Sequence, residues 1–292
     1  MAAGNSDNSG NHNADNAPDN GGAESFRALC ADFYVNHKLQ VKMELPKARE
    51  TVLDLFERVR RQFPNMSNFR RYRDELALES TQAEMPHRWM AIKGTHLRSG
   101  VVNADSLREA ISLHSMLLEA APNYLSISPL DVDYVELLFG FDLLASGNHD
   151  SIVLDALLDK SPLHELVDIP TAHVTDFQPA VGLSLGKGPV TGLSHPGGNF
   201  EVYFEVKTRP TDPKVRDAAG PAHVSGPAYG VPSDGEPISV YLTLRKFGPV
   251  GDIRDLPMIL NKLARTGQDL IENRLVPGVL VPLREAISSG NA

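Results

Sequence analysis

The sequence contains a single cysteine, Cys30, among 292 residues. One cysteine excludes an internal disulfide and the cysteine clusters that bind structural zinc. Long apolar runs are also missing, because the best candidate, residues 132–145, is broken by Glu136 and Asp142. A membrane-spanning helix needs about 20 apolar residues, so we expect no membrane partner. The N-terminus has no basic start, since its first basic residue is Arg27, and no apolar stretch, which disfavours a secretory signal. These absences predict a cytoplasmic protein.

Motifs for common cofactors are missing too. The sequence has no Gly-x-Gly-x-x-Gly fingerprint of dinucleotide-binding folds and no His-x-x-x-His or His-Glu-x-x-His pair. The glycine-rich stretch at residues 182–188 lacks the Gly-Lys-Ser/Thr ending of a phosphate-binding loop, so we interpret it as a strand and a turn. We therefore expect no cofactor and no metal.

The composition is that of a folded, acidic protein. Apolar residues make up 41% of the chain, which is enough for a sizeable core in one large domain or two small ones. The formal net charge is −9 and the pI is near 5.6, a balance that disfavours a general nucleic-acid binder.

Two segments are too polar to pack. Residues 1–24 carry no large apolar side chain after Met1, so we predict a disordered tail. Residues 210–237 are rich in Pro, Gly, Ala and Asp, and a loop of that length is usually functional or disordered. We favour disorder for this loop because it has almost no large apolar residue.

Between these segments, apolar periodicity predicts alternating strands and helices. For the first half, residues 25–130, we expect a strand from Phe33, a helix from Pro46, two strands at 69–80 and 88–97, and a helix at 105–121. The second half, residues 131–292, has predicted strands at 132–144, 181–186, 200–208 and 238–247. One predicted helix follows Asn148, and a second spans residues 256–276. The fold class is thus α+β, an antiparallel sheet with helices on one face.

The two halves repeat a similar order of elements. Residues 51–56 (TVLDLF) resemble residues 152–157 (IVLDAL), and each segment follows a strand at a similar distance. We therefore predict an internal duplication of two ferredoxin-like β-α-β-β-α halves. The alternative is one long curved sheet that grips the final helix and encloses a ligand cavity.

The string Gly147-Asn148-His149-Asp150 resembles the Gly-Asn-His-Asp/Glu element of calcineurin-like metallophosphoesterases, in which Asn and His serve a two-metal site. That family also needs an upstream Asp-x-His and a downstream Gly-His-x-His, and this chain has neither. We interpret the string as a strand-to-helix turn with Asn148 as the helix cap.

An arginine cluster is the candidate binding site. Six arginines lie within sixteen residues, interleaved with Phe63, Phe69 and Tyr72: Arg58, Arg60, Arg61, Arg70, Arg71 and Arg73. Guanidinium groups bind phosphate and carboxylate in bidentate fashion, and aromatic rings can stack on bases. The alternative is a solvated surface whose charge is balanced by Glu57, Asp74 and Glu75.

Three functions remain open. The sequence has no recognisable set of catalytic residues, which favours a non-catalytic binding or interaction module. The arginine cluster would suit an anion- or nucleotide-responsive module, with an acidic protein partner or a phosphorylated ligand. The third possibility is an enzyme with a dispersed site that uses Glu75, Glu79, His96 or Asp142.

Overall fold

The structure is a computed structural model that describes residues 22–81, 83–159, 161–167, 169–186, 200–209 and 237–290. The first half consists of α1 (Gly22–Arg27), β1 (Asp32–Val41), α2 (Arg49–Gln62), β2 (Met66–Tyr72), β3 (Glu75–Ser80), β4 (His87–Lys93), β5 (His96–Val102) and α3 (Leu107–Tyr124). The second half consists of β6 (Val132–Leu143), α4 (His149–Leu158), η1 (His164–Leu166), β7 (Ala180–Leu185), β8 (Phe200–Lys207), β9 (Ile238–Phe247), η3 (Ile253–Asp255), α5 (Leu256–Leu270), η4 (Ile271–Leu280) and α6 (Val281–Gly290).

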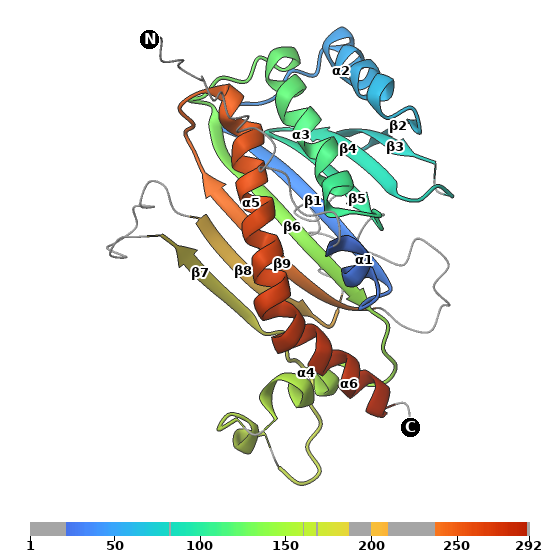
Figure 1. The fold of residues 1–292 in the computed structure, drawn as a ribbon, viewed down its shortest axis with the longest axis vertical. Coiled ribbons are helices and arrows are strands. Elements are labelled where there is room, and N and C mark those ends of the chain that lie inside the picture. Colours follow the sequence, from blue (N-terminus) through green and yellow to red (C-terminus); the bar gives the residue numbers. More distant parts are fainter. Residues whose placement is uncertain are drawn as a thin grey trace, which may run out of the picture.

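The described strands form one nine-stranded sheet in the order β2-β3-β4-β5-β1-β6-β9-β8-β7. All neighbouring pairs are antiparallel. Figure 1 shows α2, α3 and the long α5–α6 helix on one side of this sheet. The predicted α+β class is therefore confirmed, and both halves contribute to a single sheet. β1 and β6 pair at its centre, with β5 beside β1 and β9 beside β6.

The first half contains two more strands than the sequence predicted. Each predicted strand after the first helix is a pair, and the turns fall at Arg73-Asp74 and Gly94-Thr95. Arg73 has a φ of 44° and Gly94 a φ of 52°, so both turns use left-handed backbone. The observed order is β-α-β-β-β-β-α, and ferredoxin-like halves are not confirmed.

Two predicted helices differ from the structure in their bounds, and one further helix lies where the sequence predicted a tail. Ser106 caps α3, since its side chain accepts from the backbone N–H of Glu109, and Pro122 lies inside that helix. The final helix was predicted to end at residue 276, before Pro277. Instead it widens into the π-helical η4, which contains Pro277, and continues as α6. At the other end, α1 begins at Gly22, within the predicted tail, and buries Ala23. Residues 1–21 and 210–236, which contain most of both predicted disordered segments, lie outside the described residues.

The core lies between the sheet and the helices. Alternate residues of each central strand point into it, as the strand periodicity predicted; in β1 these include Phe33, Val35 and Leu39, all with 0% exposure. Phe33 packs on Phe141 of β6 with ring centroids 5.2 Å apart. No helix among the described residues combines the length and apolarity needed to cross a membrane.

Two histidines are buried in this core beneath α3. The Nδ1 atom of His114 lies 2.8 Å from the Ser99 hydroxyl oxygen, and its Nε2 atom lies 3.2 Å from the Val35 carbonyl oxygen. A carbonyl only accepts, so the proton of neutral His114 is on Nε2. The His37 ring lies 5.6 Å from that of His114. Burial lowers the pKa of His114 to about 3 and that of His37 well below its usual range.

Candidate functional site

The side of the sheet opposite the helices, which we call the open face, is rich in aromatic residues with polar atoms. The strand registers place five of the seven tyrosines and the only tryptophan on it. They are Tyr34, Tyr72, Trp89, Tyr134, Tyr203 and Tyr241. No described helix covers this face (Figure 1). Tyrosine and tryptophan are favoured where one end of a side chain is apolar and the other meets water or a partner.

In the first half, the open face holds a buried ion pair. The Arg98 guanidinium donates to the Glu75 carboxylate at 2.6 Å, and the two side chains are 2% and 7% exposed. Arg98 on β5 reaches β3 across Ala91 of β4, whose small side chain leaves room above it. Nearby, the Tyr72 hydroxyl donates to Glu79 at 2.9 Å.

Trp89 packs beside this ion pair, flat over Gly100 of the neighbouring strand. A Cβ at Gly100 would lie 2.2 Å from the indole nitrogen of Trp89 and 2.4 Å from Oδ1 of Asn36, so only glycine fits there. Within the described structure, that indole N–H and that Oδ1 atom are buried and have no hydrogen-bond partner. Unsatisfied buried polar atoms are rare in proteins.

At the end of the central strand β6, the open face holds a buried carboxylate. Asp142 Oδ1 accepts from the Ser239 hydroxyl at 2.7 Å and from the Tyr34 hydroxyl at 3.3 Å. Burial raises the pKa of Asp142 to about 6, while the hydrogen bond from Ser239 opposes that rise. Such a group can exchange a proton near neutral pH.

The second half carries a partly exposed cluster around Arg245. Its guanidinium donates to Glu136 from Nε at 2.9 Å and from Nη2 at 2.5 Å. The guanidinium carbon lies 4.7 Å from the ring centroid of Tyr134, 5.5 Å from that of Tyr203 and 5.8 Å from that of Phe247. Cation–π contacts of this kind hold the aromatic rings in fixed positions around the charge.

The four residues proposed for a dispersed enzyme site all lie on the open face: Glu75, Glu79, His96 and Asp142. They do not form one site. Glu75 pairs with Arg98, Glu79 accepts from Tyr72, and Asp142 belongs to a separate network across the sheet centre.

The predicted arginine cluster is divided by the sheet. Arg58, Arg60 and Arg61 lie on the last turns of α2. Arg71 shares the helix side of β2 with Phe69, which packs on Phe56 of α2 at 5.7 Å. Arg70 points to the open face, and Arg73 sits in the β2–β3 turn.

Only part of the predicted charge compensation of the arginine cluster by Glu57, Asp74 and Glu75 is present. Arg60 pairs with Glu57 at 2.6 Å, as the sequence suggested. Arg70 pairs with Glu79 at 3.5 Å rather than with a residue of the cluster, and Glu75 pairs with Arg98. The other four arginines have no ion pair among the described residues: Arg58, Arg61, Arg71 and Arg73.

The residues of the metallophosphoesterase-like string have structural roles. The Asn148 side chain accepts from the Ser151 N–H at 3.2 Å and so caps α4. His149 contacts the carbonyl oxygens of Ala145 and Thr208 at 3.1 and 3.3 Å. The part of the chain that the structure describes contains no group of three or more His, Cys, Asp or Glu residues placed to hold a metal ion.

β7 carries a sequence pattern that is also found in hydrolases. Residues 182–186 (GLSLG) match the Gly-x-Ser-x-Gly pattern of hydrolase nucleophiles. In those enzymes the serine sits on a sharp strand-to-helix turn, whereas Ser184 lies within β7, opposite Glu201 of β8. The match therefore gives this serine no nucleophile geometry.

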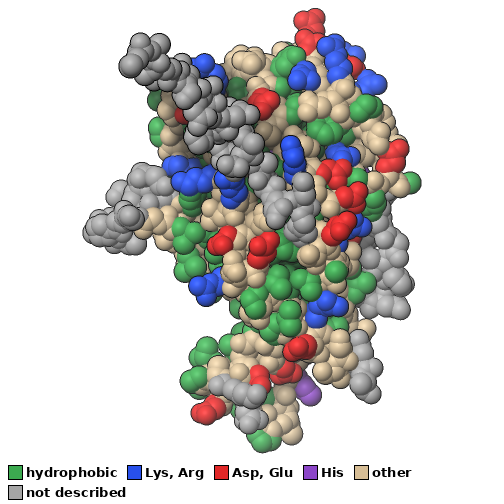
Figure 2. Space-filling model, in the orientation of Figure 1, with side chains coloured by type: hydrophobic (Ala, Val, Ile, Leu, Met, Phe, Trp, Pro, Cys, Tyr) green, Lys and Arg blue, Asp and Glu red, His purple; other side chains and the backbone are tan. Residues whose placement is uncertain are grey.

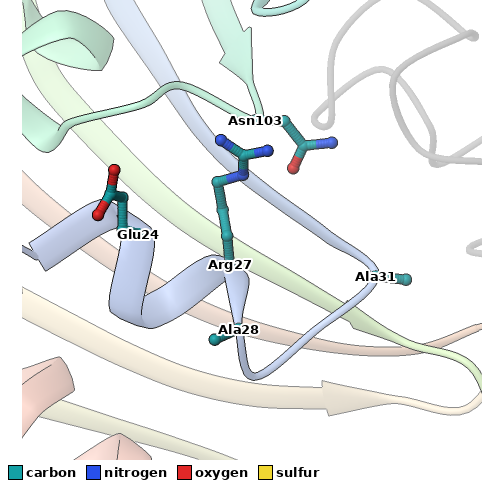
Figure 3. Close-up of a pocket in the computed structure, with 5 residues that line it drawn as sticks. All are labelled: Glu24, Arg27, Ala28, Ala31 and Asn103. Atoms are coloured by element: carbon teal, nitrogen blue, oxygen red, sulfur yellow. The ribbon is translucent and has the colours of Figure 1, made fainter.

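A shallow pocket of about 350 Å³ lies beside α1, lined by Glu24, Arg27, Ala28, Ala31 and Asn103 (Figure 3). Two of its polar side chains, Arg27 and Asn103, are already engaged. Arg27 donates to Asp105 at 2.9 Å, and Asn103 donates to Asp32 at 2.7 Å while accepting from the Phe33 N–H.

No protein-family model matches the chain, and a search of curated proteins finds no match either.

Proposed function

We propose that this protein is a non-catalytic binding module and that a protein partner contacts the open face of the second half. The Arg245 cluster carries the proposal. It combines arginine and tyrosine, two of the residue types that dominate binding energy at protein interfaces. These side chains are partly exposed and held in place by Glu136, so little ordering entropy is lost when a partner binds.

A second observation supports the same surface. The Tyr203 hydroxyl donates to Glu201 at 2.5 Å, which fixes the ring next to Arg245. Both partners lie on β8, two residues apart, and they extend the cluster toward the outer strands. The resulting surface has a guanidinium group with aromatic rings around it, and two carboxylates fix Arg245 and Tyr203 in place.

The proposal predicts that partner binding depends on Tyr134 and Tyr203. A Tyr134→Ser/Tyr203→Ser variant should lose at least one protein that co-purifies with the wild type, measured by quantitative mass spectrometry. Phe69→Ser, which removes an exposed aromatic ring from the helix side, is the control and should retain that protein. Thermal unfolding verifies that both variants fold. An identical set of proteins with all three chains would contradict the proposal.

The anion-responsive module is the second candidate, favoured by the four arginines without an ion pair. It predicts that an Arg58→Ala/Arg61→Ala/Arg71→Ala variant loses affinity for nucleotides or short single-stranded RNA, titrated at low salt. An Arg60→Ala/Arg70→Ala variant is the control, because those two guanidinium groups already bind carboxylates. Wild-type binding should weaken steeply as salt rises. Equal weak binding by all three proteins would remove this candidate.

We also infer that the two halves arose by duplication. The paired positions of β1 with β6, β5 with β9, and α3 with α5 on either side of the sheet centre support this inference. Each half then contributes its own aromatic cluster to the open face, one around Trp89 and one around Arg245.

A further inference from the structure

The two edges of the sheet are protected to very different degrees. At one edge, β2 carries Arg70 and Arg71, with Arg73 in the adjoining turn. Charged residues on an edge strand prevent it from pairing with another chain. At the other edge, β7 has the sequence AVGLSL, without charge or proline, and within the described residues it pairs only with β8. An edge of this kind is a template for strand pairing.

The helix side of β7 is also uncovered. Val181 and Leu183 point to the side that the helices cover elsewhere in the sheet, yet they are 53% and 46% exposed. In the first half, α2 covers the corresponding outer strands through Phe56 and Phe69. In the second half, α4 packs against α6 beyond the end of the sheet, and no described helix covers β7 (Figure 1). Hydrophobic side chains gather at this edge on the left of Figure 2.

The surroundings of this edge are charged differently at its two ends. At the Leu185 end, Lys246 lies opposite Phe200, and the Lys262 ammonium group lies 4.8 Å from the Phe200 ring centroid. Beyond the Ala180 end lies an exposed apolar knob that also carries the exposed Glu165. The knob consists of Leu163, Leu166, Val167 and Ile169, which are 56%, 70%, 40% and 61% exposed.

We propose that this edge is where a second copy of the chain binds. The two β7 strands pair antiparallel about a two-fold axis perpendicular to the sheet, which extends nine strands to eighteen. Residues directly opposite each other in an antiparallel pair share a face. On the helix side, each strand therefore contacts the other through Val181, Leu183 and Leu185. On the open face, the two strands contact each other through Ala180, Gly182 and Ser184. No charge lies on either strand, so pairing brings no like-charge repulsion.

Charge complementarity selects a second copy as the occupant. Antiparallel pairing places the Ala180 end of each β7 beside the Leu185 end of the other. Glu165 on the knob of each copy is thereby directed toward Lys246 and Lys262 of its partner, and a two-fold axis makes this contact twice. The knob also supplies area, because a six-residue strand pair alone is smaller than the roughly 1,200–2,000 Å² of a stable interface. This proposal concerns the sheet edge and does not depend on the open face.

Sedimentation velocity of the full chain tests the edge contact. The wild type should form a dimer, and Leu183→Lys should raise the dimer dissociation constant by about tenfold or more because it places two like charges at the axis. Met85→Lys is the matched control, since Met85 is 48% exposed and lies between β3 and β4 toward the opposite edge. It should leave the dimer intact. Thermal unfolding verifies the fold of each variant.

A charge exchange tests the knob. Glu165→Lys and Lys262→Glu should each weaken the dimer, and the double variant should regain most of the loss. A wild type that sediments as a monomer up to its solubility limit would overturn the proposal. A dimer that is equally stable with Leu183→Lys would overturn it as well, because another surface would then hold the copies together. Failure of the double variant to recover would also overturn the proposal, because the contact of Glu165 with the partner's lysines is what selects a second copy as the occupant.

Discussion

Replacing Arg98 by alanine is expected to lower the free energy of unfolding by about 3–5 kcal/mol, because the change leaves Glu75 as a buried, uncompensated charge. The two side chains are 2% and 7% exposed, so bulk solvent screens the Glu75 charge only weakly. Urea unfolding at neutral pH measures the effect.

Two further variants make this test specific. Arg254→Ala is the control, since Arg254 and Asp252 pair at 2.6 Å but the arginine is 86% exposed, and water screens such a pair. We expect little change there. An Arg98→Met/Glu75→Leu double variant removes both charges and should recover most of the stability lost with Arg98→Ala. An Arg98→Ala variant as stable as Arg254→Ala would show that the buried ion pair does not hold β3 to β5.

Acid should destabilise the fold through His114. Burial lowers the pKa of His114 to about 3 in the folded state, whereas the unfolded chain titrates near 6.5. The unfolded state therefore binds the extra proton first, and the stability present above pH 6.5 is lost as the pH falls. At pH 4.5 this loss is about 2–3 kcal/mol for one histidine. His37 acts in the same direction.

The measurement compares wild type with His114→Gln in urea at pH 7 and pH 4.5. Asp142 opposes the histidines, because its raised pKa of about 6 means that acidification relieves the cost of its buried charge. That term is common to both proteins, so the difference between them isolates His114. The variant should lose less stability on acidification than the wild type. Equal losses would mean that the buried imidazole is not kept neutral by the fold.

Much of the fold was predictable from local periodicity. The alternation in Phe33–Val41, Phe200–Lys207 and Ile238–Phe247 matches β1, β8 and β9, because one face of each strand must be apolar to reach the core. The hairpin at Arg73 was missed because its positive φ usually belongs to glycine or asparagine. Pro277 was read as a helix stop, but η4 is π-helical there and continues past it.

The candidate site was less predictable, for a topological reason. The alternation of the first strand puts Tyr34 on the side opposite the apolar residues. It could not reveal strand order, so the contact of Arg98 with Glu75 across β4 was not visible. The Arg245 cluster joins β6, β8 and β9, whose rings come from positions up to 113 residues apart (134 to 247). In contrast, the six predicted arginines are close in sequence but divided between two sides of β2.

The most direct test of the proposed function is photo-crosslinking from the Arg245 cluster. A photoreactive phenylalanine analogue is incorporated in place of Tyr203 in one chain and in place of Glu119, an exposed residue of α3 on the helix side, in another. Illumination in cells, followed by mass spectrometry, identifies the covalent adducts. A protein adduct that forms from position 203 and not from position 119 is the result we predict. Adducts from position 119 alone would contradict a partner on the open face.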